Sequence, residues 1–233
     1  IYGSSPSNYQ LVELFSCNGA IADKSICVGN NGAYFLNSDG IYYYDGTNTT
    51  LVSQKIKNII GRMNKNYANK SVAIYHDNKY YLAIPTDGSE NNNTLIEFNT
   101  MNNSFMTYDI DNINSFLEFE NELLYSSGQK IKSLFNGTKA LPLLWTTPLF
   151  DFGAKNYRKM SNYIYLRVKG QGKLKLKLKT ERKTKELIID LPEEETLLRK
   201  KLKNKGRMFQ LMIENVDNSS FELVAPELIC ELD

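Results

Sequence analysis

The sequence of 233 residues has little of the chemistry that most enzymes use. It contains one histidine, His76, and no second histidine to share a metal ion or a proton with it. The patterns of a P-loop, a dinucleotide-binding loop, a zinc-protease helix and a serine nucleophile elbow do not occur. We therefore expect no enzyme activity, no catalytic residue, no metal site and no cofactor, and we interpret His76 as a surface residue in a turn.

Cysteine and long apolar runs are also scarce. The three cysteines, Cys17, Cys27 and Cys230, are odd in number and lack the paired spacing of a zinc site. A disulfide framework is therefore not expected, and synthesis in a reducing compartment is the simpler interpretation. No apolar run approaches the roughly 20 residues that a membrane-spanning helix needs, so no membrane contact is predicted.

Tyrosine and phenylalanine, in contrast, are abundant, with 15 and 11 copies. Both suit half-buried strands. Residues 27–46 hold two short aromatic runs bounded by Asn, Asp, Ser and Gly, which is typical of a β-hairpin with flanking turns. The steps Asn31-Gly32, Asp39-Gly40 and Asp45-Gly46 predict sharp reversals with positive φ.

This plan recurs twice downstream, in units of an apolar strand, an Asn/Asp turn, a Tyr-rich strand and a Gly turn. Four-stranded units of about 40 residues have the period of β-propeller blades. Three units do not close a ring, so earlier blades are expected upstream of Ile1. Ordinary meanders in one irregular sheet remain the alternative. The expected strands are 25–28, 32–37, 40–45, 48–52, 72–75, 80–84, 94–98, 104–109, 116–119, 123–125 and 130–135.

Between the first two units, Ile56, Ile59, Ile60 and Met63 share one face at helical spacing. This spacing predicts a short amphipathic helix over 55–63 that connects the units and covers a sheet edge or a gap between sheets.

The charge balance changes near residue 140. Residues 1–140 carry 10 Lys+Arg and 13 Asp+Glu, a balance of −3, and residues 141–233 carry 18 and 13, a balance of +5. We therefore expect two domains, propeller-like blades over 1–140 and a small β-sandwich over 141–233. Residues 169–172 are predicted to form a turn within the second domain. Residues 191–206 fit a helix or a strand from their own pattern.

A basic face is predicted on the second domain. Lys and Leu alternate from Lys173 to Lys179, as in a half-buried strand with its lysines in water. Such a face has three readings: contact with an acidic protein partner, contact with DNA phosphates, or a solvated strand that resists aggregation. Lys205 and Arg207 continue the basic run. The candidate contact residues are Lys173, Lys175, Lys177, Lys179, Arg182, Lys183, Lys185, Arg199, Lys200, Lys201 and Lys203.

Three segments carry a resemblance to a known family. Residues 40–46 (Gly-Ile-Tyr-Tyr-Tyr-Asp-Gly), residues 145–153 (Trp-Thr-Thr-Pro-Leu-Phe-Asp-Phe-Gly) and residues 205–211 (Lys-Gly-Arg-Met-Phe-Gln-Leu) resemble stretches of tailed-phage head-to-tail hub proteins, also called packaged-DNA stabilisation or tail accessory proteins. The resemblance implies an all-β virion protein with β-propeller blades. It also favours a strand at 197–202.

The resemblance further implies a structural role. Such proteins form rings below the portal, help to retain packaged DNA and support the tail. We therefore expect a virion protein, assembled in a bacterial cytoplasm, with portal, adaptor or tail proteins as partners, a homo-oligomeric ring and non-specific contact with packaged DNA. The alternative is a non-catalytic glycan- or protein-binding propeller of a cell-surface or secreted protein.

Overall fold

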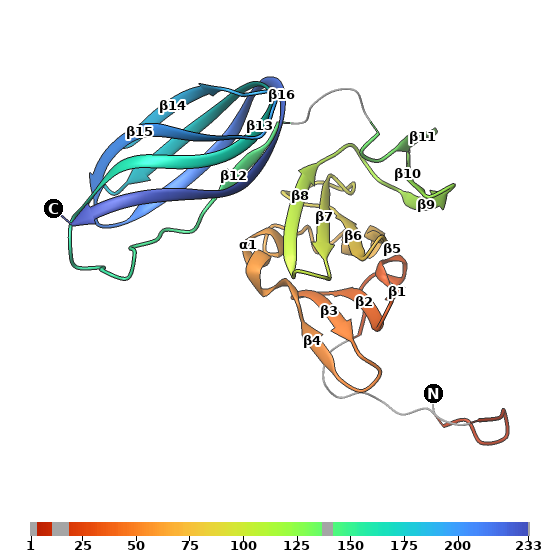
Figure 1. Cartoon of the computed structure of the whole chain (residues 1–233). Helices are drawn as coiled ribbons and strands as arrows, with labels where there is room; N and C mark the ends of the chain where they lie inside the picture. The colour runs from red at the N-terminus through yellow and green to blue at the C-terminus, as the bar shows by residue number, and fades with distance from the viewer. Residues whose placement is uncertain (1–3, 11–18, 137–141, 233) are drawn as a thin grey trace. The chain divides into compact units, whose positions relative to one another are not determined.

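The computed structural model describes residues 4–10, 19–136 and 142–232, where antiparallel strands dominate and helical segments are short (Figure 1). The expected all-β class is confirmed. The chain forms two compact units, residues 1–136 and 137–233, which we call the N-terminal and C-terminal units. The boundary expected near residue 140 falls among residues 137–141, outside the described residues.

The N-terminal unit contains three antiparallel sheets, and in each the strands pair in chain order. The predicted strands between residues 25 and 135 are confirmed, with ends that differ by up to two residues. The first sheet is β1 (Cys27–Gly29), β2 (Gly32–Asn37), β3 (Gly40–Tyr44) and β4 (Thr49–Leu51). The second is β5 (Val72–His76), β6 (Lys79–Ile84), β7 (Thr94–Asn99) and β8 (Ser104–Asp109), and the third is β9 (Ser115–Phe119), β10 (Glu122–Ser127) and β11 (Lys130–Ser133).

Local turn chemistry sets the registers of these sheets. Asp77-Asn78 and Glu120-Asn121 each form a two-residue hairpin loop with positive φ at both positions, the conformation that favours the strand twist. Gly46 has φ of 99°, as its Asp-Gly step predicts. Gly40 differs, because its φ is not positive and a Cβ there would lie 2.3 Å from Ser53 Oγ. Close packing, rather than a turn conformation, requires that glycine.

The three sheets pack face to face, and the second is buried on both sides. Alternate residues of β6 point in opposite directions. Tyr80 and Leu82 join Leu36 of the first sheet in one core cluster. Tyr81 joins Leu123 of the third sheet in another. The sheet that contains the predicted Tyr-rich strand, β6, is therefore the central layer of the unit.

First strands and short helices complete the packing. Consecutive sheets contact each other chiefly through their first strands, β1 with β5 and β5 with β9. The predicted helix over 55–63 is shorter, with a 3-10 turn η2 (Ser53–Ile56) and a helix α1 (Lys57–Ile60). Its predicted face is confirmed in that Ile56, Ile60 and Met63 enter the core with Leu36. Two other 3-10 turns are η1 (Asp23–Ser25) and η3 (Ala68–Lys70).

The C-terminal unit is one five-stranded antiparallel sheet. Two of its strands are long, with 22 and 24 residues, and they pair with each other along almost their whole length. The first half of β13 also pairs with β15, and its second half pairs with β14. The strands are β12 (Leu144–Thr146), β13 (Lys159–Thr180), β14 (Thr184–Asp190), β15 (Thr196–Gly206) and β16 (Phe209–Leu232).

The sheet bends in the middle and encloses its own core. Ile164 from one half of β13 and Leu176 from the other half lie fully buried in the same cluster. Asn204 near the end of β15 donates to the carbonyl of Leu178, so the two halves meet again at that end. The turn predicted at residues 169–172 is wrong, because β13 stays paired to β16 through Gly170 and Gln171.

Two further expectations concern this unit. The strand favoured at 197–202 is confirmed, within β15. The alternation from Lys173 to Lys179 is confirmed as well: Leu174, Leu176 and Leu178 are fully buried. The sandwich expected from separate short strands is instead a single bent sheet whose halves face each other across a leucine-rich core.

Candidate functional site

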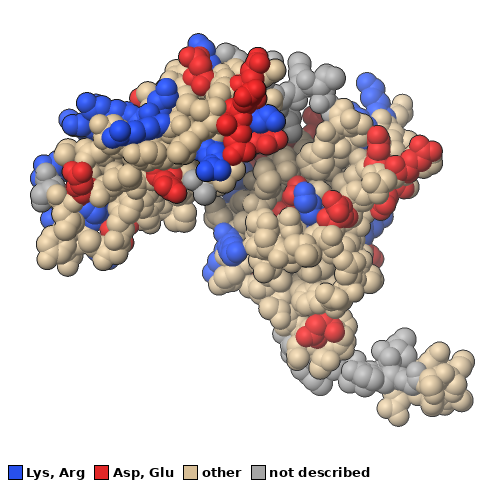
Figure 2. All heavy atoms as spheres, viewed as in Figure 1, with Lys and Arg blue, Asp and Glu red and all other residues tan. Residues whose placement is uncertain are grey.

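The eleven predicted basic residues do not form a single plate. The lysine row (Lys173, Lys175, Lys177 and Lys179) lies on β13 where it pairs with β14. The basic residues of β15 lie beside the other half of β13. On the face seen in Figure 2, Lys and Arg gather over one part of the C-terminal unit and Asp and Glu over another part. The bend of β13 separates the two basic groups.

Acidic neighbours partly neutralise the lysine row. Lys175 Nζ lies 3.3 Å from Glu186 and 4.0 Å from Glu214. Lys177 also pairs with Glu214, and this hydrogen bond raises the pKa of Lys177. The local sequence pattern does not indicate this neutralisation, because Glu214 is distant in the chain and comes beside the row only through the pairing of β13 with β16. Lys173 and Lys179 remain exposed.

Arg199 of β15 lies over two tyrosines of β13. The Arg199 guanidinium carbon lies 3.8 Å from the ring centroid of Tyr163 and 5.9 Å from that of Tyr165. Stacking of this kind holds the arginine against the sheet. Lys200 is half-buried, whereas Lys201 and Lys203 are exposed.

The remaining predicted residues meet at one end of the C-terminal unit. Arg182 and Lys183 lie in the turn between β13 and β14, Lys185 lies in β14, and Lys203 comes from β15. They border a pocket of about 290 Å³, which we call the basic end pocket. Its lining residues are Arg158, Met160, Arg182, Lys183, Lys185, Lys203, Asn204 and Lys205. Six of these eight residues are cationic, and none is acidic.

Hydrogen bonds shape the floor of the basic end pocket. Buried Asn204 donates to the carbonyls of Leu178 and Lys183, at 2.8 and 3.2 Å. The carboxylate of Glu181, in the adjoining turn, accepts from the backbone N–H groups of Arg207 and Met208. Burial alone would raise the pKa of Glu181, but these N–H donors leave it lowered overall. The Glu181 carboxylate is therefore bound by backbone N–H groups.

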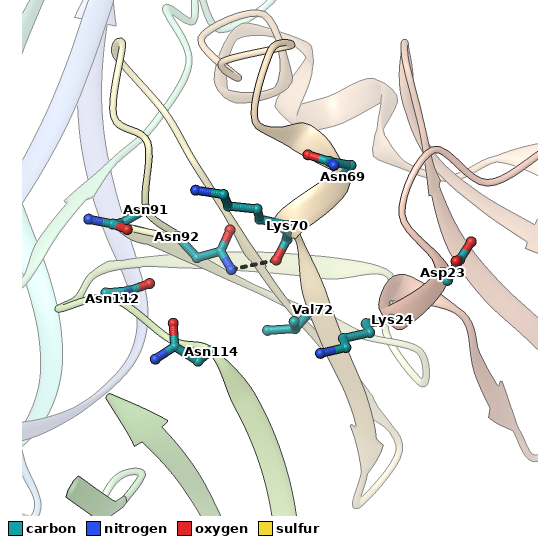
Figure 3. A pocket seen from close by; sticks show the side chains of 9 residues that line it. All are labelled: Asp23, Lys24, Asn69, Lys70, Val72, Asn91, Asn92, Asn112 and Asn114. Atoms are coloured by element: carbon teal, nitrogen blue, oxygen red, sulfur yellow. Dashed lines mark hydrogen bonds between the residues drawn. The ribbon is translucent and has the colours of Figure 1, made fainter. Parts of the chain in front are cut away.

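A second pocket, in the N-terminal unit, is lined mainly by amides (Figure 3). We call it the asparagine pocket. It holds about 540 Å³ and lies where η1, η3 and the loops before β7 and β9 come together. Side chains that both donate and accept hydrogen bonds suit a polar ligand or ordered water. The lining residues are Asp23, Lys24, Asn69, Lys70, Val72, Asn91, Asn92, Asn112 and Asn114.

Asn92 connects the parts of this pocket. Its Nδ2 donates to the backbone carbonyls of Lys70 and Ile113, both at 2.8 Å (the bond to Lys70 is drawn in Figure 3). Asn92 is 3% exposed, and its Oδ1 has no partner among the described residues. These asparagines were not among the predicted site residues, because the run at 91–93 has only the composition of a polar loop.

A third pocket, which we call the tyrosine pocket, combines aromatic rings with amides. It holds about 270 Å³ between the first two sheets. The Tyr34 ring stacks on Tyr75 with centroids 5.8 Å apart, and Asn30 Nδ2 donates to Asn78 Oδ1 at 2.7 Å. Burial, with the neighbouring phenols, raises the pKa of Tyr34 to about 12. The lining is Asn30, Asn31, Tyr34, Tyr43, Val52, Tyr75, Asn78, Phe98, Thr100, Met101 and Asn103.

His76 differs from its interpretation as a surface residue in a turn. It ends β5, its side chain is 16% exposed, and its Nδ1 lies 3.3 Å from Glu118 Oε2 on β9. The pairing links the first strands of the second and third sheets. Within the described residues, no group of three or more His, Cys, Asp or Glu side chains has the geometry of a metal site.

The described chain contains no helix that is both long and apolar enough to cross a membrane. Comparison with known proteins adds no assignment: no protein-family model matches the chain, and no curated protein matches it.

Proposed function

We propose that this chain is a structural protein of a tailed phage or prophage. In this proposal it forms part of the head-to-tail connector or tail hub, assembles with copies of itself and with portal, adaptor or tail proteins, and helps to retain packaged DNA in the virion. The fold serves as a scaffold that offers surfaces for contact and performs no chemistry.

The observation that carries the proposal is the stack of three meander sheets. In each sheet the strands are antiparallel and pair in chain order. Consecutive sheets contact each other through their first strands. Blades of a β-propeller are built in this way around a common axis. The described residues form no closed ring, so we propose these sheets as neighbouring blades of a larger propeller. The resemblance of residues 40–46 to phage hub proteins agrees with this.

The outer faces of the stack support further contacts. Val28 on the first sheet is 78% exposed, and Leu117 and Ile131 on the third sheet are 52% and 71% exposed. In the middle sheet the equivalent faces are buried. Apolar faces of this kind usually mark surfaces that another element covers. In our proposal, neighbouring blades or a neighbouring copy cover them.

The tyrosines of residues 40–46 stiffen the loops that such an assembly uses. The Tyr43 hydroxyl donates to the carbonyl of Asn31, and the Tyr44 hydroxyl donates to the carbonyl of Gly46, both at 2.6 Å. Each bond fixes a turn to a strand. Rigid loops on a rigid sheet lose little entropy when they dock, which favours a scaffold over an adaptable binder.

Mass photometry of the full-length gene product tests the proposal. We expect an assembly of six or more copies, alone or with the portal protein encoded beside it. A double variant, Leu117→Lys with Ile131→Lys, should reduce the assembly if the third sheet faces a neighbour. A matched variant that adds the same charge at exposed polar positions, Ser104→Lys with Gln129→Lys, should not. A strict monomer under all conditions, encoded away from portal and terminase genes, would contradict the proposal.

The tyrosine pocket supports a second candidate function, the recognition of a glycan. Aromatic faces beside amide donors and acceptors match the apolar and hydroxyl faces of a sugar ring. Titration calorimetry with neutral oligosaccharides tests this, with Tyr75→Ala as the variant and Tyr157→Ala as a control on an exposed tyrosine. Saturable heat that Tyr75→Ala alone abolishes would favour the glycan-binding module.

A further inference from the structure

We propose that the basic end pocket of the C-terminal unit binds the phosphate backbone of double-stranded DNA. The inference deepens the proposed function, on which the identification of that DNA as the packaged genome rests. It assigns the DNA contact to one end of the bent sheet and excludes the lysine row as its main site.

Positive charge from several segments is concentrated at the basic end pocket. Arg158 precedes β13, Arg182 and Lys183 occupy the turn after it, and Lys185 and Lys203 come from two further strands. The bend of β13 brings these separate segments to one pocket. Arg182, Lys183, Lys185 and Lys203 are all exposed, so their charged groups can reach an anion. Among the residues that the structure describes, no carboxylate lines the pocket.

The basic end pocket also contains a hydrogen-bond donor without a partner among the described residues. Arg158 Nε is buried and has no hydrogen-bond partner among the described residues. A buried N–H group without a partner carries a desolvation cost, which is relieved if the Arg158 side chain moves toward an anion at the pocket. A phosphate offers oxygens that match the planar donors of arginine. The pocket therefore supplies a guanidinium group with a donor for such an anion.

The lysine row gives an internal comparison. Lys175 and Lys177 each contact Glu214, and Lys175 also contacts Glu186. A phosphate that approaches this row meets carboxylates as well as lysines. To bind Lys175 or Lys177 it must compete with their ion pairs to Glu186 and Glu214. Two acids lie near the basic end pocket, and neither lines it. Glu181 accepts from the backbone N–H groups of Arg207 and Met208. Glu231 lies opposite Met160 in the pairing of β13 with β16.

The lining also favours nucleic acid over an acidic protein. The cores of protein interfaces are rich in aromatic residues and poor in lysine. Here four of the eight described lining residues are lysines, and Met160 is the one apolar residue among these eight. Contacts to DNA phosphates need positive charge and no apolar centre. The composition of the pocket is therefore that of a backbone contact, which is independent of DNA sequence.

The test is fluorescence anisotropy with the whole chain and labelled double-stranded DNA over a range of salt concentrations. The test variant is Arg182→Gln with Lys183→Gln and Lys185→Gln. The control variant is Lys173→Gln with Lys175→Gln and Lys179→Gln, which removes the same charge from the lysine row. All six side chains lie outside the buried cores, and Trp145 fluorescence with circular dichroism verifies folding.

We expect the test variant to lose at least about tenfold in affinity near 0.1 M salt, and the control variant to lose less than about threefold. Loss of three phosphate contacts should also lower the salt slope by about 2.7. Equal losses in both variants, or no binding of the unchanged protein, would overturn the proposal. Displacement of the DNA by polyglutamate at equal charge would point instead to an acidic protein. The assembly measurement uses no DNA, so failure here leaves that test independent.

Discussion

The two units reach a buried β core by different means. The N-terminal unit divides its core between short sheets, with large polar-tipped residues such as Tyr80 and Tyr81 at the contacts. The C-terminal unit folds one sheet over itself, with Leu174, Leu176 and Leu178 as the centre. Short strands joined by tight turns leave many backbone carbonyls outside the strand pairing, and tyrosine hydroxyls and asparagine amides donate to them. Two long paired strands leave few such carbonyls, so aliphatic residues are enough to form the core between them.

The aliphatic core of the bent sheet should be the most sensitive part of the molecule. Leu176→Ala removes a fully buried side chain and should lower the free energy of unfolding of the C-terminal unit by about 3–5 kcal/mol. Urea unfolding followed by fluorescence of Trp145, which lies in that unit, measures this. Ile188→Ala is the control, because Ile188 is 57% exposed and should cost about 0.5 kcal/mol or less.

The same variant also examines the independence of the two cores. The buried clusters of the N-terminal unit contain no residue of the C-terminal unit. Hydrogen exchange of the N-terminal unit should therefore stay unchanged in Leu176→Ala. If protection falls in both units together, the comparison between them fails.

In the N-terminal unit, the largest single polar effect is expected at Asn92. Asn92→Leu leaves the carbonyls of Lys70 and Ile113 without their side-chain donor, which should cost about 2–3 kcal/mol. Thermal unfolding followed by tyrosine absorbance measures the change. Asn91→Ala is the matched control, since Asn91 is exposed. If Asn92→Leu were as stable as the unchanged protein, amide bonds would not hold these loops together.

The bend of the long strands gives a third comparison. A Cβ at Gly170 would lie 2.3 Å from the backbone oxygen of Ser220 on β16. Gly170→Ala should therefore disturb the β13–β16 pairing and cost about 1–3 kcal/mol. Gly19→Ala, at a glycine with open space around it, should be close to neutral. Equal stability of the two variants would show that the bend tolerates a side chain.

Local and distant causes explain how much of this could be predicted from sequence. The strands of the N-terminal unit follow from residues such as Asp77 and Asn78, whose turn preferences act within a few residues. The Lys–Leu alternation likewise predicted which face of β13 is buried. Whether Gly170-Gln171-Gly172 forms a turn or a bend depends on the partner strand β16, which lies far along the chain.

The candidate sites divide in the same way. Lys183 and Lys185 could be selected as exposed charges from their own segment. The neutralisation of Lys175 could not, because Glu214 reaches it only through strand pairing. Arg158 was missed for the same reason, and so were the asparagines whose loops converge in space. Pairing between strands that are distant in the chain decides which side chains share a pocket. The local sequence pattern does not indicate which strands pair in this way.

The smallest expected effect is a difference between the units in alkaline solution. Burial raises the pKa of Cys27 to about 11 and that of Tyr34 to about 12, and it raises the pKa of Tyr80 well above its ordinary value. In the C-terminal unit, burial raises the pKa of Cys230 to about 11. These groups are neutral in the folded state and lose protons more readily when unfolded.

Their contribution to stability is therefore complete below the ordinary pKa values of 9.0 for the thiols and 10.0 for the phenols. It is lost as the pH rises through the folded values, toward about 11 and 12. Because the N-terminal unit buries more such groups, its unfolding midpoint in urea should fall further between pH 8 and pH 11 than that of the C-terminal unit. Circular dichroism follows the unfolding of both units, and Trp145 fluorescence isolates that of the second.

Tyr80→Phe sharpens this comparison. The variant loses the bond from the hydroxyl to the carbonyl of Ser25, so it should be less stable at neutral pH by about 1 kcal/mol. It also loses a group that resists ionisation, so its stability should fall less steeply above pH 10. Tyr9→Phe, at an exposed tyrosine, should leave both the stability and the slope unchanged. If Tyr80→Phe kept the full alkaline slope, the buried phenol would not be its source.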